Sequence, residues 1–154
     1  MLDLECGQGR DAVPLARLVY SITGVDLSKT GIEQMNQIAQ IEGLDLVGQV
    51  EDIYAFDRFH KFDIVLLDSM FHFAKNDREK EIGLIQRIIS DLRSGSIAVI
   101  CLPNTGNKVQ ILNQAIDFEN KLLRLVEKEF TYRFEESETG HTSETDFKMI
   151  VVQK

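Results

Sequence analysis

The sequence predicts an α/β fold: a doubly wound, mostly parallel seven-stranded sheet with helices on both faces and a C-terminal antiparallel hairpin. Three observations predict this class. Short apolar runs alternate with segments of helical spacing, and such alternation calls for parallel strands joined by right-handed crossovers. The run from Phe62 to Asp68 is almost wholly apolar, as expected for a strand in the middle of a parallel sheet. Two final strands flank a polar loop, which is typical of a hairpin.

The first half of the predicted order is strand, helix, strand, helix, strand. We expect strands over residues 1–6, 21–27 and 46–51. Asp11 is a plausible N-cap for a helix over residues 11–19, and Pro14 then falls in its first turn. Ser28 begins the second helix and Gly43 ends it; its apolar residues recur at helical spacing, at Ile32, Met35, Ile38 and Ala39.

The second half continues the alternation. After the strand over residues 62–68, Asn76 or Asp77 caps a helix that Ser94-Gly95 ends, and the next strand covers residues 96–102. We expect a long helix from Lys108 to about Glu127, because apolar residues recur at helical spacing along it. The last strands are expected near residues 130–135 and 146–152, with the hairpin loop from Glu136 to Thr145 carrying His141.

Length and composition predict one domain over residues 1–154, because 44% hydrophobic residues suffice for a single core and no linker divides the chain. The net charge of −8 argues against a nucleic-acid partner. No apolar stretch approaches the roughly 18 residues that span a bilayer, so we expect a cytoplasmic protein without a membrane partner. The cysteines, Cys6 and Cys101, have no metal-ligand spacing with the histidines; we expect buried thiols and no metal site.

Acidic residues surround the predicted ligand site. A glycine turn between a strand and a helix normally binds phosphate, but Asp3 and Glu5 precede this turn and oppose an anion. Glu5, Asp26, Asp52 and Asp68 stand at the carboxyl ends of predicted strands, which meet at one edge of a doubly wound sheet. A ligand with an ammonium and a sulfonium group complements these charges, so the charge pattern favours S-adenosylmethionine.

Five motifs carry a resemblance to a known family. They are Asp3-Leu-Glu-Cys-Gly-Gln-Gly-Arg-Asp11, Gly24-Val-Asp-Leu-Ser28, Glu51-Asp-Ile53, Phe62-Asp-Ile-Val-Leu-Leu-Asp68 and Leu92-Arg-Ser-Gly-Ser96. In this order and spacing the chain resembles the class I S-adenosylmethionine-dependent methyltransferases, collinearly from Met1 to about Leu102. The resemblance implies a methyltransferase with S-adenosylmethionine as its cofactor.

The resemblance also assigns cofactor contacts, starting at the glycine turn. Gly7 and Gly9 would let the backbone approach the methionyl part of the cofactor. Asp26 matches the acid that accepts both ribose hydroxyls, and Leu27 would pack on the adenine.

Further contacts come from the third and fourth strands. Asp52 matches the acid that receives the adenine amino group, and Ile53 offers a backbone N–H to a ring nitrogen. The chain at Asp68 and Ser69 would face the amino group and the methyl donor.

The sequence departs from the family pattern in two ways. Glu5 replaces the first glycine of the turn, so it either pairs with the cofactor ammonium or crowds the site; we count it and Asp3 among the cofactor contacts. The chain also begins inside the first strand, so the helical segment that covers the cofactor in the family is apparently missing. The cover would then come from a longer chain or from another subunit, for example in a homodimer.

In-line methyl transfer needs an acceptor held on the methyl axis and requires no covalent residue. His72, in the loop after the fourth predicted strand, is the candidate base if the acceptor must lose a proton, although a single histidine at such a place more often caps or packs against the following helix. Met70, Phe71 and Phe73 either wall an acceptor pocket or belong to the core. Charge and size favour a small-molecule acceptor.

Two other functions remain open. Gly7-Gln-Gly9-Arg-Asp-Ala12 also fits the dinucleotide fingerprint of an NAD(P)-dependent oxidoreductase, with Asp26 at the distance of ~20 residues that binds a ribose. Asp3 and Glu5 argue against it, because they would repel the pyrophosphate. A non-catalytic S-adenosylmethionine-binding module is the second alternative, favoured by Glu5 and by the missing cover segment.

Overall fold

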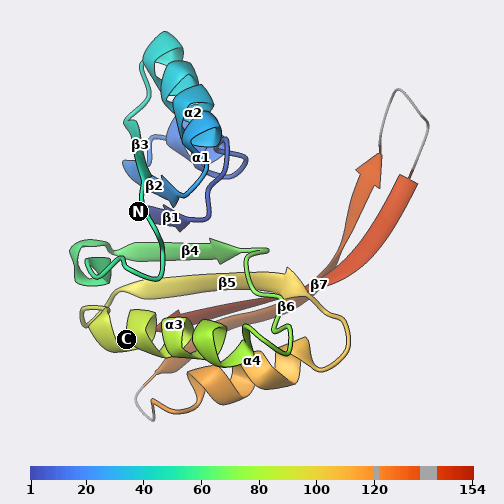
Figure 1. Cartoon of the computed structure of the whole chain (residues 1–154). Helices are drawn as coiled ribbons and strands as arrows, with labels where there is room; N and C mark the ends of the chain where they lie inside the picture. Colours follow the sequence, from blue (N-terminus) through green and yellow to red (C-terminus); the bar gives the residue numbers. More distant parts are fainter. Residues whose placement is uncertain (120–121, 136–141) are drawn as a thin grey trace.

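The computed structural model describes residues 1–119, 122–135 and 142–154. One sheet has the strand order β3-β2-β1-β4-β5-β7-β6 (Figure 1). Its strands are β1 (Leu2–Leu4), β2 (Ile22–Asp26), β3 (Leu46–Val50), β4 (Ile64–Asp68), β5 (Ile97–Pro103), β6 (Leu123–Glu135) and β7 (Thr142–Gln153). The strands from β1 to β5 pair in parallel, and β7 is antiparallel to both β5 and β6. The predicted fold class, with its C-terminal antiparallel hairpin, is confirmed.

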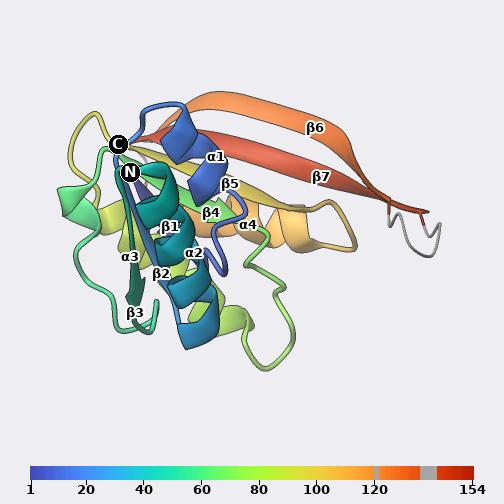
Figure 2. The same cartoon turned by 90° about the horizontal axis from the view of Figure 1, so that it is seen from above.

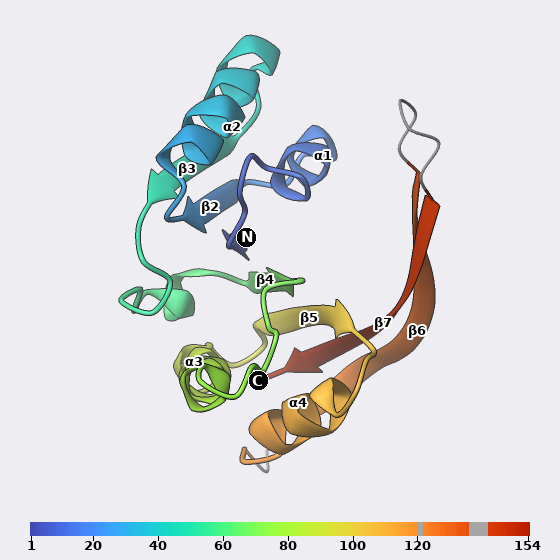
Figure 3. The ribbon, with the colours of Figure 1, turned by 45° about the vertical axis from the view of Figure 1, so that its right-hand side comes forward.

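Helices cover both faces of the sheet (Figure 3). One face carries α1 (Ala12–Arg17) and α2 (Lys29–Glu42), and the other carries α3 (Arg78–Asp91) and α4 (Lys108–Ile116). A short 3-10 helix, η1 (Phe59–Lys61), lies between β3 and β4. Among the described residues, no helix combines the length and the apolar character needed to cross a lipid bilayer.

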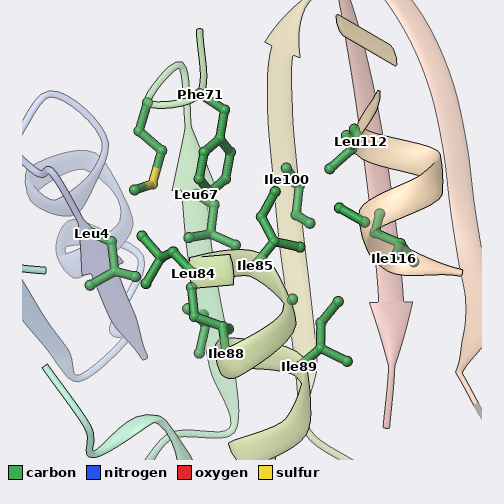
Figure 4. Packing of buried hydrophobic residues seen from close by; sticks show 14 of the residues in the cluster. Leu4, Leu67, Phe71, Leu84, Ile85, Ile88, Ile89, Ile100, Leu112 and Ile116 are labelled. Atoms are coloured by element: carbon green, nitrogen blue, oxygen red, sulfur yellow. The ribbon is translucent and has the colours of Figure 1, made fainter. Parts of the chain in front are cut away.

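The pleat of the strands divides the buried side chains between two hydrophobic layers. Alternate residues of a strand point to opposite faces, so Val65 and Leu67 of β4 pack toward α3, whereas Leu66 and Asp68 point to the α1 face. Figure 4 shows Leu67 among the isoleucines of α3 and beside Ile100 of β5. A second, smaller cluster joins α1 and α2 to the α1 face of the sheet.

Local signals predicted the ends of α2 correctly. The Ser28 side chain accepts a hydrogen bond from the Gly31 N–H at 3.2 Å, which caps the first turn. Gly43 follows the last turn with φ of 65°, in the left-handed region that glycine adopts without steric cost. Cys6 and Cys101 are buried thiols, as expected, and burial raises the pKa of each to about 12.

The predicted helix from Lys108 to Glu127 is wrong in its second half. Helix α4 ends at Ile116, and residues from Leu123 onward belong to β6. The apolar residues around Leu123 and Leu125 fit the two-residue period of a strand as well as the period of a helix. The local pattern therefore does not distinguish a strand from a helix here. Pairing with β7 decides the structure: Leu123 lies opposite Gln153, and the ladder continues to Glu135, with a register shift between Arg124 and Val126.

The hairpin is longer than the sequence predicted. Strand β7 begins at Thr142, inside the expected loop from Glu136 to Thr145, whereas His141 lies outside the described residues. The last residue of β5, Pro103, lies opposite Phe147, so the hairpin continues beyond the carboxyl end of β5. Figures 1 and 2 both show this extension projecting past the rest of the molecule.

Candidate functional site

The turn after β1 has an unusual backbone. Glu5, Gly7 and Gly9 all have positive φ, at 54°, 55° and 87°. The two glycines serve different purposes. A Cβ on Gly9 would lie 2.7 Å from Cγ of Met35, so packing against α2 excludes a side chain there. A Cβ on Gly7 would meet no atom within 4 Å, so this part of the backbone is open to a ligand.

Asp26, at the end of β2, holds the turn in place. Its Oδ2 accepts the Gly7 N–H at 2.8 Å, and its Oδ1 accepts the Ser28 N–H at 2.7 Å. Each carboxylate oxygen has a further lone pair, so these bonds leave acceptor capacity for a ligand. Asp26 therefore links the open turn after β1 to the start of α2 and still presents oxygen atoms at the carboxyl edge of the sheet.

Two cavities lie along this edge and meet at Glu5. The larger, of about 510 Å³, is lined by Glu5, Gly7, Asp68 and Ser69 among others, and we term it the turn cavity. The smaller, of about 190 Å³, we term the Asp52 cavity; its lining is Glu5, Asp26, Leu27, Asp52, Ile53 and Tyr54. The structure thus brings eight of the ten predicted cofactor residues to two adjoining cavities. Gly9 and Asp3 line neither.

Glu5 occupies a position where the resemblance implies glycine, and its backbone conformation is one that favours glycine. A residue with φ of 54° is in the left-handed region, where a side chain is disfavoured. Burial raises the pKa of the Glu5 carboxyl, and the neighbouring Asp26 raises it further, whereas His72 acts in the opposite direction. The carboxyl is therefore close to Asp26, at the junction of the two cavities.

Asp3 lies beneath the site rather than on its surface. Its side chain points to the α1 face and is only 2% exposed, and its Oδ2 has no hydrogen-bond partner among the described residues. Burial raises the pKa of Asp3 to about 7, with smaller contributions from Asp11 and Asp68. The Asp3 carboxyl therefore keeps its proton to a higher pH than an exposed aspartate does.

Arg10 is a site residue that the sequence reasoning missed. Its guanidinium forms ion pairs with Asp11, at 3.1 Å, and with Asp68 at the end of β4. The pair with Asp68 connects the glycine turn to the neighbouring strand. A basic residue within the glycine turn, next to Asp11 and at the edge where Asp68 was expected, is the sequence signal that could have identified it.

Glu81 of α3 was also missed, and it shapes the loop that carries His72. This glutamate is 5% exposed and accepts the N–H groups of His72 and Phe73, at 3.3 and 2.5 Å. Phe73 has φ of 51°, so the loop adopts a turn that these hydrogen bonds hold. The His72 side chain is exposed and lines neither cavity. Phe71 and Phe73 belong to the core, whereas Met70 also borders the turn cavity.

The Asp52 cavity combines a turn and an apolar wall. The Asp52 Oδ1 accepts the Tyr54 N–H at 2.9 Å, which forms the turn after β3 and leaves Oδ2 unused by that bond. Leu27 is 68% exposed, so the apolar wall of this cavity is open to solvent. A planar ring lying between Leu27 and the Asp52 turn would cover this apolar surface.

A sheet of this strand order, with an open glycine turn after β1 and acids at the ends of the neighbouring strands, defines the class I methyltransferase fold. The chain belongs to the methyltransferase domain family, whose model matches residues 1–153. The resemblance noted in the sequence is therefore confirmed.

Three curated relatives illustrate this membership. The chain is similar to the probable S-adenosyl-L-methionine-dependent methyltransferase TehB of Haemophilus influenzae, with 31% identity over 78 residues, covering 51% of this chain and 27% of TehB. The crystal structure of that protein superposes with a TM-score of 0.76 at 20% identity, over 99% of this chain and 57% of TehB.

The other two relatives carry different names. A ubiquinone biosynthesis O-methyltransferase of Chelativorans sp. is 31% identical over 106 residues, covering 68% of this chain and 40% of the relative. A 23S rRNA (uracil(1939)-C(5))-methyltransferase, RlmD of Photorhabdus laumondii, is 28% identical over 111 residues, covering 68% of this chain and 24% of the relative. The chain thus matches less than half the length of each of these relatives.

Proposed function

We propose that this protein binds S-adenosylmethionine at the edge formed by β1, β2, β3 and β4 and transfers its methyl group to a small-molecule acceptor. The observation that carries the proposal is the accessible turn at Gly7. A Cβ on Gly7 would meet no atom within 4 Å, so a ligand can approach the backbone there. Asp26 holds this turn, and its carboxylate keeps free acceptor capacity. When bound, S-adenosylmethionine supplies a methyl group on a positively charged sulfur. The residues present fit such a ligand in shape and charge.

Each residue of the edge has a role in this proposal. Asp26 accepts the ribose hydroxyls while it holds the turn, and Asp52 accepts the adenine amino group with the oxygen that its own turn leaves unused. Leu27 covers the adenine face, and Ile53 offers its backbone N–H. Gly7 gives the methionyl part its close approach to the backbone.

The inner end of the turn cavity receives the charged end of the cofactor. Asp68 and Ser69, which are hydrogen-bonded to each other at 3.0 Å, face this cavity together with Glu5. Asp3 and Gly9 act from below: Gly9 allows α2 to pack under the turn, and Asp3 adds negative charge behind Asp68. His72 remains the candidate base, because its exposed ring lies near enough to Glu5 to affect the pKa of that carboxyl.

Charge supports a small-molecule acceptor over RNA. One relative is named for a 23S rRNA reaction, so the relatives do not agree on an acceptor class. Phosphate groups of RNA require a Lys/Arg surface, whereas this chain has a net charge of −8 and an acidic edge at its site.

The cofactor is tested by calorimetric titration of the purified chain with S-adenosylmethionine, S-adenosylhomocysteine, NADH and NADPH. We expect heat with the first two ligands and a loss of affinity of about tenfold or more in Asp26→Asn, since two ribose hydrogen bonds depend on that carboxylate. Asp45→Asn is the matched control, the same chemical change at an exposed aspartate before β3. Binding of NADH without S-adenosylhomocysteine would instead support an oxidoreductase.

Turnover separates an enzyme from a non-catalytic binding module. The chain is incubated with S-adenosylmethionine and a panel of small hydroxyl, amine and thiol acceptors, and S-adenosylhomocysteine is measured by mass spectrometry. Product above the acceptor-free rate supports a methyltransferase. Tight binding of the cofactor with no product from any acceptor would support the module.

Assembly is a separate question that sedimentation analysis answers. If a homodimer supplies the cover over the site, S-adenosylhomocysteine affinity should increase with protein concentration in step with dimer formation. An affinity that is constant while the chain remains a monomer would refute the homodimer.

A further inference from the structure

Three aromatic side chains gather on one face of the projecting hairpin. Phe130 and Phe147 lie opposite each other across β6 and β7, and Tyr132 is two residues beyond Phe130, so all three point to the same side. The rings of Phe130 and Phe147 stack with centroids 5.7 Å apart, and Tyr132 meets Phe147 edge-on at 6.1 Å. We term these residues the hairpin aromatics.

The hairpin aromatics remain accessible instead of filling a core. Phe130 is 38% exposed and Tyr132 is 49% exposed, although both are large enough to stabilise a core when buried. Figure 3 shows the hairpin curving beside the carboxyl end of the sheet, where the glycine turn also lies. Three accessible rings in mutual contact form a contiguous apolar patch, and such patches are typical of binding surfaces.

These rings form one wall of a cavity of about 320 Å³. The opposite wall consists of Arg10, Asp11, Asp68 and Ser69, and all four also line the turn cavity. The two cavities are therefore neighbours, and the ion pair between Arg10 and Asp68 belongs to the lining of both. An acceptor must lie next to the methyl donor, so a cavity that shares lining residues with the turn cavity has the position that methyl transfer requires.

The chemistry of the lining selects among acceptors. The three rings offer faces on which a flat ring stacks. The charged wall holds one guanidinium and two carboxylates, so it carries a net negative charge, and both carboxylates already engage the guanidinium of Arg10. An anionic acceptor would meet like charge without a free cation, whereas a neutral ring avoids that penalty.

We propose that the cavity between the hairpin aromatics and the Arg10–Asp68 pair is the acceptor subsite, and that it takes an uncharged planar ring bearing a hydroxyl group. The proposal rests on the proposed methyltransferase function. In the reaction, the hydroxyl oxygen forms the new bond to the methyl carbon as the carbon–sulfur bond breaks. The electron pair of that bond remains on sulfur, which becomes neutral, and the hydroxyl proton goes to the candidate base His72 or directly to solvent water.

The test uses three probes that differ by one property each: phenol, cyclohexanol of similar size, and 4-hydroxybenzoate, which adds a negative charge. Binding to the full chain saturated with S-adenosylhomocysteine is measured by NMR titration. Phenol is expected to bind several times more tightly than cyclohexanol or 4-hydroxybenzoate. Equal binding of cyclohexanol, or tighter binding of the benzoate, would overturn the proposed substrate class.

Variants locate the probe. Phe147→Leu keeps an apolar side chain but removes the stacking surface, so it should weaken phenol binding about threefold to tenfold while leaving S-adenosylhomocysteine affinity unchanged. Phe118→Leu is the matched control, since Phe118 is 42% exposed and lines no part of this cavity. Equal phenol affinity in Phe147→Leu and Phe118→Leu would refute the subsite. A wild-type chain that binds no S-adenosylhomocysteine would instead refute the proposed function.

Discussion

Replacing Glu5 with glycine tests why this chain departs from its family at the centre of the site. The variant restores the residue that suits a φ of 54°. A side chain in the left-handed region costs roughly 1–2 kcal/mol, and glycine loses about 0.5–1 kcal/mol more conformational freedom on folding. The two effects oppose each other, so Glu5→Gly should raise the free energy of unfolding by about 0–1.5 kcal/mol, measured by urea denaturation.

Glu5→Gln separates the charge from the backbone, because it keeps the same strain without a carboxylate. The pKa of Glu5 is higher in the folded chain than in the unfolded chain, mainly through burial and secondarily through Asp26. An acid of this kind loses stability as pH rises through its titration, since folding then opposes the charged form. The free energy of unfolding of Glu5→Gln, compared with that of the wild type, should therefore be more favourable at pH 8 than at pH 4.

Ligand binding by the same two variants distinguishes a contact from an obstruction. The Glu5 side chain stands where the turn cavity and the Asp52 cavity meet, so Glu5→Gly should join them and tighten S-adenosylhomocysteine binding severalfold. S-adenosylmethionine has one more positive charge than S-adenosylhomocysteine. Glu5→Gln should therefore weaken the binding of S-adenosylmethionine more than the binding of S-adenosylhomocysteine. Loss of S-adenosylhomocysteine affinity by about tenfold in a folded Glu5→Gly chain would refute this reasoning.

Three further changes test the support beneath the site by denaturation. Gly31→Ala places a Cβ 2.8 Å from the Gly7 carbonyl oxygen and should lower the free energy of unfolding by about 1–3 kcal/mol. Gly83→Ala, on the open side of α3, is the control and should raise it by about 0.5–1 kcal/mol. Equal effects of the two substitutions would contradict the close packing of Gly31. Because the pKa of Asp3 is raised from 3.8 to about 7, the wild type should lose stability between these pH values, and Asp3→Asn should remove that slope; an unchanged slope would mean that Asp3 does not titrate there. Glu81→Gln leaves one loop N–H without its acceptor and should lower stability by about 1–3 kcal/mol, with faster amide exchange in that loop; unchanged exchange would argue against its role.

The parts of the fold that depend on local chemistry could be predicted from the sequence. Ser28 and Gly43 mark the ends of α2 because a cap and a left-handed residue act within one helical turn. The apolar run before Asp68 identified a central strand because a strand covered on both faces is apolar at almost every position. The second half of the predicted last helix failed because β6 depends on pairing with β7, and Leu123 meets Gln153 from 30 positions away in the chain.

The residues of the candidate site also divide into those that the sequence could predict and those that it could not. Eight cofactor residues predicted by resemblance meet at two adjoining cavities, because the ends of parallel strands gather at one edge. Arg10 and Glu81 escaped prediction because their roles depend on partners that only the fold brings close: Arg10 pairs with Asp68, 58 positions away, and Glu81 reaches back from α3 to the loop before it. The burial of Asp3 and, among the described residues, the lack of a hydrogen-bond partner for its Oδ2 likewise depend on packing that only the fold establishes.

The structure also changes what the acidic edge means for a positively charged ligand. Counted in the sequence, the acids at the strand ends form a strongly negative rim. In the structure, Asp26 and Asp52 accept backbone N–H groups, and Asp68 is paired with Arg10. Among the described residues, Glu5 has neither an ion pair nor a hydrogen bond, so its charge is the least compensated at the site. Recognition of the ribose and adenine should therefore depend on Asp26 and Asp52, whereas the preference for the charged methyl donor over its neutral product should depend chiefly on Glu5.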